Sequence, residues 1–134
     1  MEALRRIYEE YGQKLARVKA QASPASGLFG TYSEVKNAPC HQEFYDGVGA
    51  WVEAFLQTGP DEEAVFRAAE WILRGAEGRE DPWFYIAAQG HALALIPLLS
   101  PAHRQQLLLR YGEAYPRHMR LPVQREIWKA LKKK

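Results

Sequence analysis

The chain has 134 residues, of which 47% are hydrophobic and 25% charged, and this ordinary globular composition excludes wholesale disorder. Its length corresponds to about one domain, and its formal net charge is only +2. A single cysteine excludes an internal disulfide, so we expect a protein of the cytoplasm.

The apolar segments are too short or too interrupted for a membrane. The opening stretch MEALRRIYEEYGQK carries charges throughout and lacks the apolar core of a signal peptide. The most apolar segment, residues 83–99, is interrupted by Gln89, Gly90, His91 and Pro97, and a membrane-spanning helix needs about 18 uninterrupted apolar residues. We expect no membrane partner.

Residues 1–22 predict an amphipathic helix. Their apolar residues recur with steps of four and three, which places them on one narrow face. They are Leu4, Tyr8, Tyr11, Leu15, Val18 and Ala22. Such a face can pair with a partner helix, but it equally suits a helix that lies on its own domain.

Residues 23–38 predict a long loop, because they open with Ser, Pro and Gly and show no period. They include Leu28, Phe29, Tyr32 and Val35, which a plain flexible linker would avoid. We expect this loop to pack on the body of the domain or on a partner.

A second helix is expected from about Pro39 to Thr58, and Gly59 and Pro60 end it. Its apolar face contains Cys40, Phe44, Val48, Trp51 and Phe55. A strip of small residues, Gly47, Ala50 and Ala54, predicts close approach of another helix.

A third helix begins after the predicted cap Asp61, and its early acids suit the positive helix start. Glu63–Arg67 and Glu70–Arg74 are pairs spaced i, i+4 that mark its exposed face. A fourth helix is expected from the cap Asp81 and Pro82 to Ile96, where Pro97 ends or kinks it.

A fifth helix follows the cap Ser100 and ends before Pro116, and a sixth begins near Pro122. Because the links are mostly short, neighbouring helices are expected to be antiparallel. The prediction is an all-α single domain over residues 1–134, an antiparallel helical bundle or a short helical-hairpin stack of five to six helices. It divides into an N-terminal amphipathic helix (1–22), a long loop (23–38) and a helical core (39–134).

The candidate ligand or partner site combines the adjacent Cys40 and His41 with Tyr45 and His91. A helix start lowers the pKa of a thiol, which favours a thiolate at Cys40, but Cys40 also lies on the apolar face with Phe44. Structural zinc sites use four converging ligands in close-spaced pairs, and this sequence has none. We therefore expect no catalytic residue, metal or cofactor, and keep a small-ligand or metal site here as an alternative.

The C-terminal segment is basic. Residues 104–134 hold nine Lys/Arg and two acids, a net charge of +7, whereas residues 1–103 have −5. This asymmetry indicates an anionic partner or acidic and basic parts that face each other. Trp128 can stack on a base, anchor a partner or belong to the core. The candidate anionic-partner residues are Arg117, Arg120, Arg125, Lys129, Lys132, Lys133 and Lys134.

The function that the sequence favours is a non-enzymatic protein–protein interaction module, whose partner is another protein or a second copy in a homodimer. The alternatives are nucleic-acid binding through residues 117–134 and the small-ligand or metal site that includes Cys40, His41 and His91.

Overall fold

The computed structural model describes residues 1–21, 35–75, 82–115 and 121–133. Within these ranges the regular structure is helical, with no β-strand. The predicted all-α fold of five to six helices is confirmed. The chain forms two compact units, Met1–Trp51 and Val52–Lys134, called unit 1 and unit 2 below.

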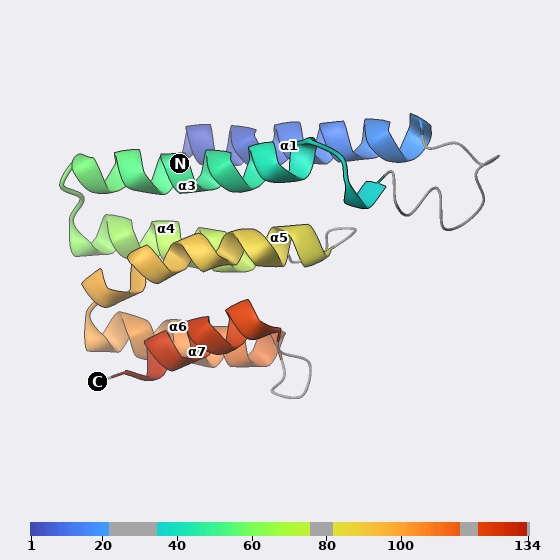
Figure 1. Ribbon diagram of the computed structural model, residues 1–134. Helices are drawn as coiled ribbons and strands as arrows, with labels where there is room; N and C mark the ends of the chain where they lie inside the picture. The colour runs from blue at the N-terminus through green and yellow to red at the C-terminus, as the bar shows by residue number, and fades with distance from the viewer. Residues whose placement is uncertain (22–34, 76–81, 116–120, 134) are drawn as a thin grey trace. The chain divides into compact units, whose positions relative to one another are not determined.

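Unit 1 pairs helix α1 (Glu2–Gln21) with the larger part of helix α3 (Cys40–Gln57), and the two run antiparallel (Figure 1). The Tyr11 ring stacks on Phe44, with 4.1 Å between ring centroids, and Tyr8 meets the same ring edge-on at 4.9 Å. The predicted apolar face of α1 is buried at Leu4, Tyr8, Tyr11 and Leu15. Aromatic packing of this kind joins the two helices.

The small-residue strip of α3 has the predicted neighbour at one position. A Cβ added at Gly47 would lie 3.4 Å from Cγ2 of Ile7, an ordinary contact with α1. The predicted stop after α3 is confirmed, because Gly59 has φ 66°, a conformation that glycine adopts without strain. Of the predicted 23–38 loop, residues 35–38 are described. Val35 and Lys36 are helical rather than loop, Asn37 is in a turn, and the Ala38 N–H donates to the Val35 carbonyl (3.3 Å). Residues 23–34 lie outside the described residues.

Unit 2 contains helix α4 (Glu62–Arg74) and helix α6 (Pro101–Ala114), which run in the same direction (Figure 1). Both predicted caps are confirmed. The Asp61 carboxylate accepts from the Ala64 N–H (2.8 Å), and the Ser100 hydroxyl accepts from the His103 N–H (3.2 Å). Such caps satisfy backbone donors that have no partner inside the helix.

The predicted fourth helix is shorter than expected. Helix α5 (Pro82–Ala88) gives way to two 3-10 helices, η2 (Gln89–Ala94) and η3 (Ile96–Leu98). Pro97 disfavours α geometry at the preceding residue, and the tighter winding begins well before it, beside Gly90, where the side chain of Val123 approaches to 3.2 Å from an added Cβ. The predicted cap Asp81 lies outside the described residues.

Helix α7 (Pro122–Lys132) packs along α6 and against η2 (Figure 1). The close approach of α6 and α7 depends on Gly112, where an added Cβ would lie only 2.8 Å from Cη2 of Trp128. Trp128 is therefore a packing residue between helices. Buried residues on α7 are Gln124, Ile127 and Leu131.

Candidate functional site

The residues of the first predicted site are divided between the units. Cys40, His41 and Tyr45 belong to unit 1, and His91 belongs to η2 in unit 2, so neither compact unit contains the whole set. Tyr45 is 40% exposed and His91 is half-buried. The four predicted residues therefore do not form one site within either unit.

His41 is held by two partners. Its Nε2 lies 2.5 Å from the Val35 carbonyl oxygen, and its Nδ1 lies 2.8 Å from the Tyr11 hydroxyl. Because a carbonyl oxygen only accepts, Nε2 carries the proton in the neutral ring, and the Tyr11 O–H donates to Nδ1. Both nitrogens thus tie the turn before α3 to α1, and neither is directed at the Cys40 thiol.

Cys40 is 6% exposed, in the core of unit 1. Burial raises the pKa of its thiol, since the thiolate would lose hydration there. A small hollow of about 170 Å³ adjoins it, lined by Ile7, Glu10, Tyr11, Lys14, Cys40, Glu43, Phe44 and Gly47. A reactive cysteine needs the opposite environment, electropositive and partly exposed, so the geometry favours a packing role.

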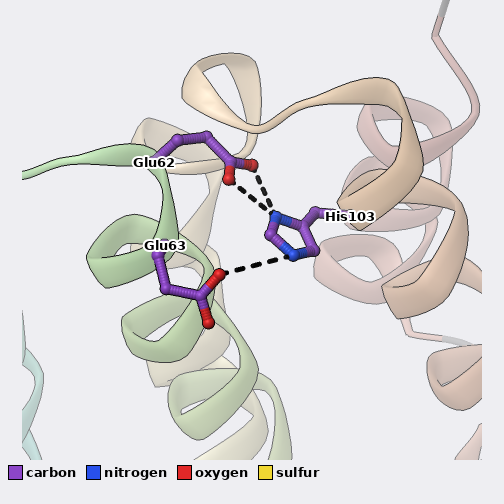
Figure 2. Close-up of side chains that lie close together, drawn as sticks. All are labelled: Glu62, Glu63 and His103. Atoms are coloured by element: carbon purple, nitrogen blue, oxygen red, sulfur yellow. Dashed lines mark hydrogen bonds and ion pairs between the residues drawn. The ribbon is translucent and has the colours of Figure 1, made fainter.

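A different cluster joins the starts of α4 and α6 (Figure 2). His103 Nδ1 donates to the Glu62 carboxylate, 2.6 Å from Oε1 and 2.8 Å from Oε2, while the Ser100 N–H donates to Glu62 Oε1 (2.7 Å). The His103 ring stacks on Phe66 at 3.9 Å. The Ser100 N–H, followed by His103, lowers the pKa of Glu62. The Glu62 carboxylate thereby links the starts of α4 and α6, and we call this contact the Glu62–His103 clasp.

Among the described residues, Glu62, Glu63 and His103 are the only three His, Cys, Asp or Glu side chains with ligand atoms within 4.8 Å of one another. His103 Nε2 and Glu63 Oε2 are 3.7 Å apart, while both Glu62 oxygens already accept hydrogen bonds. A cation here would also face the positive starts of two helices. The donor set therefore fits a structural clasp better than a metal centre.

A second ion pair links α4 and α6 two turns further along. Arg110 donates from Nη1 to Glu70 Oε2, and Arg74 Nη1 lies 4.0 Å from Glu70 Oε1. The predicted Glu63–Arg67 and Glu70–Arg74 pairs are confirmed, at 3.4 and 4.0 Å. Because the helices run in the same direction, the Glu62–His103 clasp and the Glu70–Arg110 pair fix their register.

The C-terminal halves of α4 and α6 border a groove of about 550 Å³, which we call the α4–α6 groove. Aliphatic and tyrosine side chains form its apolar part, and two Glu and two Arg form its charged part. The lining residues are Glu70, Leu73, Arg74, Leu107, Arg110, Tyr111, Glu113, Ala114 and Tyr115. A volume of this size is typical of binding sites.

The buried side-chain amide of Gln89 holds three residues that line the groove. Gln89 is fully buried, and its Nε2 donates to the Leu73 carbonyl (2.8 Å) and to the Tyr115 hydroxyl (3.0 Å). Its Oε1 accepts from the Tyr111 hydroxyl (3.1 Å). Both tyrosines that line the groove are thus fixed by one side chain, which pre-organises the surface.

Sequence reasoning missed both the clasp and the groove. It identified Asp61 and Ser100 as caps, but the pattern of one helix does not tell which other helix lies beside it. Gln89 was visible as a polar residue in an apolar segment, and a buried polar side chain with several partners is the signal that could have located the groove.

The described part of the predicted basic surface lies on α7 and at Lys133, the residue that follows it. Arg125, Lys129, Lys132 and Lys133 are exposed, and Lys132 Nζ lies 5.8 Å from the centroid of the Trp128 ring. Arg117, Arg120 and Lys134 lie outside the described residues.

Comparisons of the chain with protein-family models, with curated proteins and with solved structures find no match. Of the helices in the described ranges, none has both the length and the apolar character that crossing a membrane requires.

Proposed function

We propose that the chain is a non-enzymatic intracellular module that binds a segment of a partner protein in the α4–α6 groove. The groove itself is the observation that carries the proposal: about 550 Å³ between two helices in fixed register. Its tyrosines are tied to the buried Gln89, so the surface is in place before a partner arrives, which reduces the ordering cost of binding.

The lining of the groove matches the anatomy of protein interfaces. Such interfaces have an apolar centre and a polar rim, and they are enriched in Tyr and Arg. Leu73, Leu107 and Tyr111 supply the centre, while Arg74 and Arg110 supply part of the rim. An aliphatic or aromatic side chain of the partner fits this apolar centre.

The charged residues of the rim determine which partner residue fits beside that apolar side chain. Glu70 is already engaged by Arg110 and Arg74. Glu113 is exposed and has no ion-pair partner among the described residues. A basic residue next to the apolar anchor therefore pairs with Glu113, and the partner segment is predicted to combine the two.

Photo-crosslinking tests this proposal. A photoreactive amino acid at Ala114, an exposed residue of the groove, is compared in cells with the same residue at Ala102, an exposed alanine in the first turn of the same helix. We expect one dominant crosslinked protein from position 114 and none from position 102. Its crosslinked peptide should contain an apolar residue beside Lys or Arg, and a second copy of this chain would appear as a product of twice the mass.

Charge reversal supplies the specificity control. Glu113→Lys should abolish the crosslink, a reciprocal reversal of the partner's basic residue should restore it, and Glu53→Lys, at an exposed acid on α3, should have no effect. Equal crosslinking from positions 102 and 114, or a crosslink indifferent to Glu113→Lys, would overturn the proposal.

A further inference from the structure

We propose that the exposed side of α7 binds the phosphate backbone of nucleic acid without reading base sequence. We use the name basic face for Arg125, Lys129 and Lys132 on this side of α7 together with Lys133, the extended residue that follows the helix. Helical spacing puts the first three on one side of α7, opposite the buried Ile127 and Leu131. This inference concerns a different surface from the α4–α6 groove and stands independently of it.

The charges of the basic face are not neutralised within the described part of the chain. None of its four side chains has an ion pair or hydrogen bond to a carboxylate there. The only acid on α7, Glu126, borders the face. Elsewhere the exposed Lys14, Arg67 and Arg110 each pair with a glutamate, whereas Arg6 and Arg17 of α1 are exposed with no ion pair to a described residue. The unneutralised cations make this face attractive to a polyanion.

The helix dipole accounts for only some of these cations. Lys129 and Lys132 lie in the last turn of α7, where positive charge is favourable. Arg125 lies in the first turn and a half, near the positive end of the dipole, where a cation gains nothing from the helix. Its alignment with the lysines is therefore better explained by a ligand that the whole face contacts.

A membrane surface is a poorer fit than nucleic acid. A basic helix that lies on a bilayer inserts its apolar side among the lipids, but the apolar side of α7, with Ile127 and Leu131, is already buried. Trp128 is also committed to packing at Gly112, so it does not supply a stacking platform for bases. The exposed side chains of the basic face are all cationic, which suits contact with phosphates rather than with bases.

The length of the face sets the expected number of contacts. From Arg125 to Lys132 the helix rises about 10 Å, the axial length of about three phosphates of one DNA strand. Three neutralised phosphates give a slope of about −2.7 for log K against log salt, so affinity should fall about 40-fold between 50 and 200 mM salt.

The test uses the full chain and a fluorescein-labelled 20-base-pair duplex, with binding measured by fluorescence anisotropy over this salt range. A duplex of unrelated sequence should bind equally well. Replacing both lysines, Lys129→Gln with Lys132→Gln, should weaken binding at 50 mM salt at least tenfold and bring the slope to about −1. Both side chains are exposed, so the helix content measured by circular dichroism should stay unchanged.

The matched control is Arg6→Gln with Arg17→Gln, which removes two exposed cations from α1 and the same net charge. It should leave affinity and slope as in the unaltered chain. An equal loss in this control, no binding at 50 mM salt, or binding to polyglutamate or to phosphatidylserine vesicles as tight as to the duplex would each overturn the proposal.

Discussion

The hollows of the two units differ in size and in the residues that line them, and this difference distinguishes a packing region from a candidate binding site. In unit 1, the hollow of about 170 Å³ adjoins the chain's single cysteine, Cys40, and Tyr11, whose hydroxyl bonds His41. Lys14 of α1 and Glu43 of α3, both on its lining, form a salt bridge at 2.8 Å. In unit 2, the α4–α6 groove is about three times larger and is lined by residues with no special reactivity. Shape rather than reactive chemistry therefore identifies the candidate site.

Gln89 is the residue on which the larger hollow depends, and its replacement should have the largest effect. Gln89→Ala leaves a cavity and removes the partners of Leu73, Tyr111 and Tyr115, so we expect a loss of about 3 to 5 kcal/mol in the free energy of unfolding. Urea unfolding followed by circular dichroism measures it. Gln105→Ala, at an exposed glutamine of α6, should change stability by less than about 0.5 kcal/mol, and similar values for the two variants would refute the supporting role of Gln89.

Substitution of one glycine in each unit compares how closely the helices pack, at Gly47 between α1 and α3 and at Gly112 between α6 and α7. Gly112→Ala places a methyl group 2.8 Å from the Trp128 ring, so the ring must leave its position between α6 and α7, at a cost of about 1 to 3 kcal/mol. Gly47→Ala meets Ile7 at 3.4 Å without overlap and gains helix propensity, so stability should rise by up to about 1 kcal/mol. Thermal unfolding of both variants checks the opposite signs; destabilisation by both would show that the unit 1 contact is as tight as that of unit 2.

The sequence predicts these helices better than it predicts their contacts. The stripe from Leu4 to Leu15, the caps Asp61 and Ser100, and the stop at Gly59 follow from local rules, and the structure agrees with each. The change to 3-10 winding at Gln89 does not; it coincides with Gly90, where an added Cβ would lie 3.2 Å from Val123 of α7, more than 30 residues away. Local spacing carries no information about such a neighbour.

The candidate site shows the same limit. Cys40 and His41 attract notice because thiols and imidazoles are common in reactive sites. Here the thiol is buried and both imidazole nitrogens are hydrogen-bonded, so both residues serve packing. Glu62 looks like an ordinary acid at a helix start, and only the meeting of α4 with α6 brings it to His103. The groove arises from that meeting, which the patterns of single helices cannot show.

Variants at Cys40 test whether this residue serves packing while the α4–α6 groove serves binding. Cys40→Ala should cost about 1 kcal/mol of unfolding free energy, because it removes one buried sulfur atom. It should leave crosslinking at the α4–α6 groove unchanged. In the unaltered chain, the raised pKa and burial of the thiol should make alkylation at pH 8 much slower than in urea-unfolded protein. Rapid alkylation of the folded chain would contradict a packing role.

The pH dependence of the clasp should be the smallest effect. Because the pKa of Glu62 is lowered in the fold, its contribution to stability is present above the ordinary glutamate pKa and is lost as pH falls through the lowered value. Glu62→Gln should therefore reduce stability at pH 7 and lessen the further loss on acidification. Thermal midpoints between pH 7 and pH 3 measure this, with Glu53→Gln as the control; identical pH profiles for the two variants would mean that the clasp contributes nothing.

The central claim is that the α4–α6 groove, and not the Cys40 region, receives a partner. Crosslinking yield from position 114, measured in otherwise unaltered, Cys40→Ala and Glu113→Lys backgrounds, tests it most directly. We expect equal yields in the first two backgrounds and loss in the third. A yield that falls with Cys40→Ala and persists with Glu113→Lys would contradict it.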